Sequence, residues 1–364
     1  MSLMELEAGF QLKQYVLEAR LGTGSAGEVW RASDGEQIVA IKFMNENLID
    51  SAVFDQHRQR LKLEINALLR LRKSNVPEVY DFNLDYERPY MVMQHIEGES
   101  YDHLIAKGDM LKIPLEKRFN AIGLIGLTLT HAHHQGIIHR DIKPANIKGI
   151  DPPYLLDFGI ALEADNVEQA RPDIGTGVYM PPTHEPLDKL SDVYSFALVV
   201  YEMLFEQHAL FTPSTVGKTV MESRDRAGEY LRTGAWRMPS GISPDELPQD
   251  LYNVDLMQLD ALFSKALGNR AERYETFALF LADLKVSLAS ERGYPLELFD
   301  ELPEESESMP ILLQKLYNGD SELAQTNYPV IEDDSRISRK WLFIGITIFA
   351  LLGTVVSILL VLNS

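Results

Sequence analysis

The chain of 364 residues contains no cysteine. This excludes disulfide bonds, thiolate nucleophiles and zinc sites built on cysteine, and it fits a reducing compartment. Basic residues are also scarce, because 34 lysines and arginines stand against 54 acidic residues, which gives a net charge of −20. Such a surface repels phosphates, so we expect no general nucleic-acid binding. A hydrophobic content of 45% still lets most of the chain bury a core.

Charge is absent altogether from residues 341–362. A helix of this length is about 33 Å long, enough to cross a hydrocarbon core of about 30 Å. Arg336, Arg339 and Lys340 precede it, so the positive-inside rule places the N-terminal bulk in the cytoplasm. A buried core helix is the alternative, but it would show a polar face. The first residues show no secretory signal. We therefore predict a single-pass membrane protein held in the lipid bilayer by residues 341–362.

Small residues recur within this predicted span. Gly353 and Ser357 are four residues apart, as are Ala350 and Thr354. This spacing can bring two helices together, which leaves a homodimer open, but the ordinary composition of a span is the favoured explanation.

The rest of the chain divides by composition. Residues 293–340 contain 11 acids, four bases and four prolines, which predicts a solvated acidic linker. Before it, short β-type runs such as 38–43 and 90–96 surround one helical pattern near 54–72, and apolar stripes at helical spacing follow at 119–132 and 191–205. We predict an α+β fold of two lobes. The predicted segments are a tail at 1–11, one domain at 12–292 with lobes 12–96 and 97–292, the linker, the span, and a stub at 363–364.

Three glycines, Gly22, Gly24 and Gly27, stand at a spacing that lets backbone approach phosphates closely. The same pattern occurs in dinucleotide sites, where a helix follows the glycines directly. Here residues 28–31 continue as strand, and a second strand ends in Lys42. The order favours a glycine flap over a nucleotide.

The most informative segment is 139–146, HRDIKPAN, followed by Asp157 after a short apolar strand. Phosphoryl transfer needs a carboxylate that orients a hydroxyl and accepts its proton, a cation on the γ-phosphate, and oxygen ligands for Mg²⁺. Asp141, Lys143, and the pair Asn146 and Asp157 can supply these in that order. Together with the flap, they predict a phosphotransferase.

With these motifs in order, the chain resembles Hanks-type protein Ser/Thr kinases over about residues 12–290, most closely the bacterial, membrane-anchored kind. The resemblance implies a bilobal kinase fold, ATP with Mg²⁺ or Mn²⁺, protein substrates, and a position at the bacterial inner membrane. Lys143 and Pro144 resemble the Ser/Thr-specific form of the catalytic loop.

The resemblance also implies roles for single residues. Asp141 is the expected catalytic base, Lys143 the cation on the γ-phosphate, and Asn146 and Asp157 the metal ligands. The nucleotide site is expected to comprise Leu21, Gly22, Gly24, Gly27, Val29, Ala40, Lys42, Glu64, Gln94 and Ile96, with Lys42 paired to Glu64 and Met93 as gatekeeper. Regulatory or structural roles are expected for Arg140, Phe158 (packed with Leu68 and His139), Thr176 and Asp192.

Three features depart from the family. Lys148 stands where the family usually has an apolar floor under adenine. Thr183 replaces the glutamate that pairs with a late arginine, expected to be Arg273, and Glu185 is the nearest substitute. Residues 160–174 contain no Ser, Thr or Tyr that could be phosphorylated and held by Arg140. We expect a carboxylate there (Glu163, Asp165, Glu168 or Asp173), a partner or a dimer to order this segment.

Two other classes remain open. A kinase-shaped membrane scaffold without catalysis is the main alternative, supported by Lys148 and Thr183 alone. A small-molecule kinase fits less well, because residues 175–182 resemble the substrate loop of protein kinases. His131, His133 and His134 are expected in the core or on the surface rather than at a metal.

Overall fold

The computed structural model of the chain describes most of its first 288 residues: 6–24, 27–49, 52–158, 176–212, 215–217 and 219–288. The chain divides into two compact units, 1–313 and 314–364, and the second lies wholly outside the described residues. The predicted linker and membrane span lie outside them too. Among the residues that are described, no helix is both long and apolar enough to cross a membrane. The span at 341–362 therefore stays a prediction.

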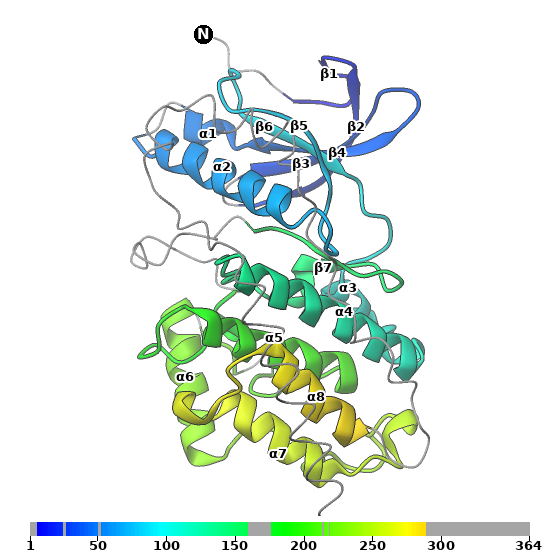
Figure 1. The fold of residues 1–364 in the computed structure, drawn as a ribbon, viewed down its shortest axis with the longest axis vertical. Coiled ribbons are helices and arrows are strands. Elements are labelled where there is room, and N and C mark those ends of the chain that lie inside the picture. The colour runs from blue at the N-terminus through cyan, green and yellow to red at the C-terminus, as the bar shows by residue number, and fades with distance from the viewer. Residues whose placement is uncertain are drawn as a thin grey trace, which may run out of the picture. The chain divides into compact units, whose positions relative to one another are not determined.

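The first half of the described chain is an antiparallel sheet with one long helix beside it (Figure 1). The six strands lie in the order β1-β2-β3-β4-β6-β5. Helix α2, Phe54–Arg70, packs against β4 and β5. The strand bounds are β1 Gln11–Leu12, β2 Tyr15–Thr23, β3 Gly27–Ser33, β4 Ile38–Met44, β5 Val79–Asn83 and β6 Tyr90–Gln94, and the short helix α1 is Glu46–Ile49.

The sheet has two chemically different faces, because side chains alternate along each strand. Trp30, Ile41 and Phe43 belong to the buried apolar cluster on one face. Val29 and Lys42, paired in register between β3 and β4, project from the other. The strand expected at 90–96 ends at Gln94 because its last partner, Val39, lies at the start of β4.

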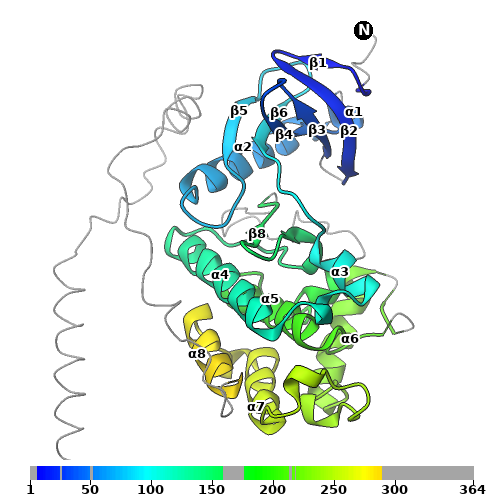
Figure 2. The ribbon, with the colours of Figure 1, turned by 90° about the vertical axis from the view of Figure 1, so that its right-hand side faces the viewer.

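The second half is mostly helical (Figures 1 and 2). Helix α5, Lys189–Phe205, is its centre, since every residue from Ser191 to Phe205 is buried. A helix that is apolar on all sides is stable only when other helices surround it, and α5 contacts both α4 and α7. The other helices are α3 Tyr101–Lys107, α4 Leu115–His134, α6 Val220–Thr233, α7 Leu256–Leu267 and α8 Phe277–Leu288; strands β7 Ile147–Lys148 and β8 Tyr154–Leu155 form a small second sheet.

Hydrogen bonds join the two halves near the end of α2. Arg70 Nη2 donates to the backbone oxygen of Gln135 over 2.6 Å. Ser74 Oγ and His131 Nδ1 lie 2.7 Å apart, which gives this histidine a structural partner. The expected α+β fold of two lobes is thus present, with the sheet in one lobe and the helices in the other.

Candidate active site

Lys42 connects the two lobes. Its Nζ lies 2.7 Å from Glu64 Oε1 and 2.9 Å from Glu64 Oε2 in α2. The same Nζ lies 2.9 Å from Asp157 Oδ1 in the other lobe. Glu64 is one of the buried residues of α2, so its carboxylate is shielded from water. The ion pair expected from the sequence is present, and Asp157 completes a cluster of three charges.

Burial and neighbouring charges shift the pKa values of the three groups in this cluster differently. Burial opposes the positive charge of Lys42, but Asp157 and Glu64 outweigh it and raise the pKa of Lys42. Lys42 in turn lowers the pKa of Asp157 to about 2. Burial raises the pKa of Glu64 to about 7 in spite of Lys42. At neutral pH, a cation and an anion therefore face each other across the lobes.

Asp192 anchors the catalytic loop from below. Its Oδ2 accepts the backbone N–H of His139 and its Oδ1 accepts that of Arg140, each over 2.8 Å. His133 Nε2 lies 2.8 Å from Asp192 Oδ2. His133 is buried in α4, so the sequence expectation of a core histidine agrees with its position, although its link to Asp192 was not foreseen.

Two residues of the site have strained backbone. Arg140 has φ of 64° and Asp157 has φ of 58°, in the left-handed region that residues with a side chain rarely adopt. Each such residue costs on the order of 1–3 kcal/mol and persists only where its surroundings hold it. Asp192 holds the first and Lys42 the second. Both strained residues are thus held by charged side chains of the site.

Asp141 has one occupied and one unoccupied carboxylate oxygen. Its Oδ2 lies 2.9 Å from Lys143 Nζ and 3.1 Å from Asn146 Nδ2. Its Oδ1 is buried and has no hydrogen-bond partner within the described part of the chain. Burial raises the pKa of Asp141, although Lys143 opposes this. A buried acceptor without a donor is costly unless it has a ligand, so this oxygen is the atom that can take a proton.

Asn146 and Asp157 form a donor set that suits Mg²⁺. Asn146 Nδ2 donates to the backbone oxygen of Asp141 over 2.8 Å, which leaves the amide oxygen as the atom that can bind a cation. Leu156 N donates to the backbone oxygen of Asn146 over 2.7 Å and holds the two ligand segments together. The described residues hold no cluster of three or more His, Cys, Asp or Glu that could enclose a metal. One amide and one carboxylate fit Mg²⁺, which takes further ligands from phosphates and water.

The glycine flap comprises the end of β2 and the start of β3, and residues 25 and 26 between them lie outside the described residues. Only Gly27 is required by its protein neighbours, since a Cβ there would lie 2.4 Å from the backbone oxygen of Phe43. A Cβ on Gly22 would meet no atom within 4 Å. Val29 lies beside Lys42 in register, while Leu21 is exposed on β2. Gly27 and Val29 of the predicted flap thus lie next to Lys42, and there is open space at Gly22.

The residues expected to bind adenine lie near the end of β6 and next to it in the sheet. Gln94 N donates to Glu78 O over 2.8 Å, and the chain then leaves the sheet toward Ile96, which is buried. Ala40, also buried, pairs with the expected gatekeeper Met93. Lys148 follows in β7.

Lys148 lies in regular strand pairing rather than in a shifted segment. It pairs with Tyr154 in β8 and forms an isolated bridge with Ser100. Burial lowers its pKa, against the charge of Glu97. The departure at the expected adenine floor is therefore a half-buried lysine close to the carboxylate of Glu97.

Of the other residues predicted from the sequence, some lie in the described segments and others lie outside them. His139 and Phe158 are both fully buried with ring centroids 4.6 Å apart, and Leu68 is buried in α2. Arg140 donates from Nε to Leu187 O over 3.0 Å. Thr176 opens a 3-10 helix, but its side chain and the carboxylates predicted at 163–173 lie outside the described residues.

The second departure is resolved by Glu185. Arg273 Nη1 lies 2.8 Å from Glu185 Oε2 and Nη2 lies 3.2 Å from Oε1, and both side chains are buried. Thr183 instead donates to Asp225 over 2.5 Å. The ion pair is therefore present, with its acid two residues later in the chain.

One polar pair near the site was not foreseen. Tyr179 OH donates to Glu202 Oε2 over 2.8 Å inside the helical lobe. Burial raises the pKa of Glu202 to about 7. The only signal in the sequence was an acid within the apolar run of α5.

Residues 15–266 match the model of the protein kinase domain family. The chain belongs to the protein kinase family. This match covers more than half of the chain and includes the flap, Lys42, the catalytic loop and Asp157.

Named relatives point to bacterial Ser/Thr kinases. The chain is similar to serine/threonine-protein kinase A of Synechocystis, with 27% identity over 77% of this chain and 60% of that protein. It is also similar to PknL of Mycobacterium tuberculosis (29%, 80% and 69%) and to the probable kinase PknB of Corynebacterium glutamicum (30%, 74% and 42%). Two of these three relatives extend well beyond the matched length.

A solved structure shows the same fold. The crystal structure of the M. tuberculosis PknI kinase domain matches with a TM-score of 0.54 and 21% identity, over 78% of this chain and 99% of that one. At this identity, the likeness concerns the fold alone. It agrees with the arrangement of a sheet lobe and a helical lobe described above.

Proposed function

We propose that this chain is a protein serine/threonine kinase that transfers the γ-phosphate of ATP to hydroxyl groups of proteins. The observation that carries the proposal is the carboxylate of Asp141. It is buried, bound through Oδ2 to Lys143, and without a hydrogen-bond partner at Oδ1 among the described residues. The hydroxyl of a serine or threonine can donate a hydrogen bond to that oxygen.

The residues divide the work by position. Asp141 Oδ1 orients the incoming hydroxyl and accepts its proton as the hydroxyl oxygen bonds to the γ-phosphorus. The bond from that phosphorus to the β-phosphate oxygen breaks, and ADP leaves. Lys143, 2.9 Å from the other oxygen of Asp141, supplies positive charge next to the transferred group. Lys42 supplies a second cation, held in place by Glu64. Phosphoryl transfer depends mainly on such positioning and charge stabilisation.

Asn146 and Asp157 are the residues that would hold Mg²⁺. When bound, the ion neutralises charge on the phosphates. The lowered pKa of Asp157 keeps this ligand ionised at neutral pH, as a hard cation requires. Mn²⁺ accepts similar oxygen ligands and is proposed as a substitute.

The proposal also covers the preference for Ser and Thr, the location of the protein and its oligomeric state. The preference for Ser and Thr rests on Lys143 and Pro144 in the catalytic loop. Location at the cytoplasmic face of a membrane rests on the uncharged run 341–362. Formation of a homodimer through this run rests on its small residues four apart, such as Gly353 and Ser357.

The alternative of a non-catalytic scaffold keeps one supporting observation. Lys148 brings a charged side chain to the expected adenine floor, where it would weaken nucleotide binding. Thr183 no longer supports the scaffold, because Glu185 makes the ion pair with Arg273. We favour catalysis since the full set of phosphoryl-transfer residues is assembled.

The full chain, purified in detergent, tests the proposal. Incubation with γ-³²P-labelled ATP, Mg²⁺ and a generic basic protein should give labelled protein, and mass spectrometry should place the phosphate on Ser or Thr. Chelation of the divalent cation should abolish the label. Binding of ATP without any transfer would favour the scaffold, and transfer to tyrosine alone would contradict the proposed specificity.

A further inference from the structure

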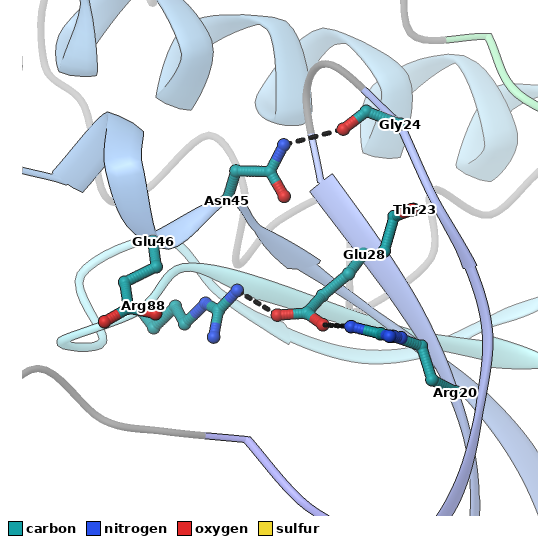
Figure 3. Close-up of a pocket in the computed structure, with 7 residues that line it drawn as sticks. All are labelled: Arg20, Thr23, Gly24, Glu28, Asn45, Glu46 and Arg88. Atoms are coloured by element: carbon teal, nitrogen blue, oxygen red, sulfur yellow. Dashed lines mark hydrogen bonds and ion pairs between the residues drawn. The ribbon is translucent and has the colours of Figure 1, made fainter.

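A hollow of about 560 Å³ lies behind the glycine flap (Figure 3). Glu28, paired with Phe43, projects to the face opposite Val29 and Lys42, because neighbouring residues of a strand alternate. The hollow is therefore separated from the expected nucleotide site by the sheet itself. Its lining combines charged, polar and glycine residues: Arg20, Thr23, Gly24, Glu28, Asn45, Glu46 and Arg88.

Arg88 is the fixed point of this hollow. Only 2% of its surface is exposed, although it lies between β5 and β6 near the protein surface. Its Nε donates to Met44 O over 2.8 Å, and its Nη2 pairs with Glu28 Oε1. Its guanidinium lies 5.9 Å from the centre of the Phe43 ring. A buried arginine is stable only when its donors are satisfied, so these contacts leave it little freedom.

Glu28 connects Arg88 to the glycine flap. It directly follows Gly27, and its second oxygen accepts from Trp30 Nε1 over 3.1 Å. Arg20 on β2 lies 3.9 Å from the same oxygen. One carboxylate therefore links β2, β3 and the segment that carries Arg88.

Asn45 holds the flap directly. Its Nδ2 donates to the backbone oxygen of Gly24 over 2.6 Å. Gly24 N in turn donates to Gly27 O over 2.8 Å and closes the turn. Figure 3 shows Asn45 reaching toward Gly24 while Arg88 and Arg20 approach Glu28 from two sides.

We propose that Asn45, Glu28 and Arg88 are positioning residues that set the height of the glycine flap above the phosphates of the nucleotide. The inference rests on the proposed function, since it concerns the same site. The flap contacts phosphates through its backbone, so the height of Gly24 and Gly27 decides how well those groups are held. Adenosine has no phosphates, so its affinity should not depend on the height of the flap.

The sharpest test is Asn45→Asp in the full chain. The substitution keeps the shape of the side chain but replaces the donor to Gly24 O by a repelling carboxylate. The Kd for Mg²⁺–ATP and the KM for ATP should rise about tenfold, the loss expected for one good hydrogen bond. The Kd for adenosine should stay within about twofold, because adenosine has no phosphates for the flap to hold.

Asn83→Asp is the matched control. Asn83 uses its Oδ1 as an acceptor from Asp85 N, which an aspartate also provides. The charge change is the same and occurs in the same lobe, so its nucleotide affinities should equal those of the wild type. Glu28→Gln is a second variant, which weakens the pair with Arg88 and should raise the KM for ATP several-fold without changing adenosine binding.

The outcomes are separable. Wild-type protein that binds neither Mg²⁺–ATP nor adenosine would overturn the proposed function itself. Wild-type protein that binds and transfers normally, with Asn45→Asp indistinguishable from Asn83→Asp, would overturn the positioning role alone. Equal weakening of ATP and adenosine in Asn45→Asp would also overturn it, because that result indicates general damage to the lobe.

Discussion

The catalytic loop, residues 139–146, keeps the spacing of the kinase family, whereas the segment after Tyr179 carries Thr183 in place of the family's glutamate and still makes the ion pair with Arg273. In the loop, Asp141, Lys143 and Asn146 meet through distances of 2.8–3.1 Å. In the second segment, Glu185 reaches Arg273 from a position two residues further along.

The difference shows which constraint acts on each region. Groups that share one reacting centre must keep their mutual geometry, because a small displacement removes the catalytic advantage. A structural ion pair needs only that two charges meet in a buried place, and more than one chain position can provide that. Changes in the first region should therefore affect rate, and changes in the second should affect stability.

Outside the catalytic loop, the largest effect is expected for Lys42→Met. The change removes the cation that Glu64 and Asp157 hold between the lobes. Phosphoryl transfer at saturating ATP should fall by about 10²–10³, in the range for loss of one electrostatic contact to a transition state. Steady-state ³²P transfer by the purified chain measures this.

Lys13→Met is its control in the same lobe. Lys13 pairs with Asp81 over 2.5 Å on the exposed side of the sheet. Surface pairs contribute at most about 1 kcal/mol to stability, so transfer should stay within about twofold of the wild type. Equal losses in the two variants would mean that Lys42 acts only through folding.

Glu185→Gln should act on stability instead. It leaves the guanidinium of Arg273 buried without its charge partner. We expect the free energy of unfolding to fall by about 3 kcal/mol, with little change in transfer per folded molecule at low temperature. Denaturant titration and activity on the same preparation give both numbers.

The double variant Glu185→Gln with Arg273→Met sharpens this prediction. Removing both charges should recover part of the lost stability, because no unpaired charge then stays buried. A rate loss like that of Lys42→Met in either variant would erase the contrast between the two regions.

Much of the candidate site and of the two-lobed fold could be predicted from the sequence, for physical reasons. Asp141, Lys143, Asn146 and Asp157 carry a pattern in fixed order because their chemistry fixes their spacing. The two-lobed fold followed from strand and helix periodicity in the two halves.

The missed contacts join residues far apart in the chain. Arg88 pairs with Glu28 across 60 positions, and neither residue type signals burial by itself. His133 and Asp192 are 59 positions apart. Such pairs follow only from the packing of the sheet and of α4 on α5, which no local pattern encodes.

Glu202→Gln should change the pH dependence of stability. Burial raises the pKa of Glu202 from 4.5 to about 7, so the folded state binds this proton more tightly than the unfolded state. That contribution is complete below pH 4.5 and is lost as pH rises through 7. Glutamine imitates the protonated form, so the variant should be more stable than wild type by up to about 3 kcal/mol at pH 8.5.

Urea titrations at pH 5 and pH 8.5 measure this difference. At pH 5 the two proteins should be nearly equally stable, because Glu202 is then protonated. Glu229→Gln, an exposed position on α6, should show no such dependence. A gain for Glu202→Gln that is the same at both values would contradict the role of the buried charge.

The smallest effect is expected for Lys148→Leu. Leucine restores an apolar surface at the expected adenine floor and removes a lysine whose pKa is lowered by burial. Adenosine and ATP should both bind about three- to tenfold more tightly, the gain from burying a modest apolar area. Isothermal titration gives the affinities, with Lys117→Leu on the surface of α4 as the control. Weaker binding would show that Lys148 contacts the nucleotide favourably.

The most direct test of the account is the rate of transfer in Asp141→Asn, measured beside Asp245→Asn, an exposed residue of a turn. Asparagine keeps the size of the side chain but cannot accept a proton from the hydroxyl. We expect a loss of about 10²–10⁴ in ³²P transfer at saturating ATP, with ATP affinity within a few-fold of wild type and no loss in the control. Equal transfer by Asp141→Asn and wild type would contradict it.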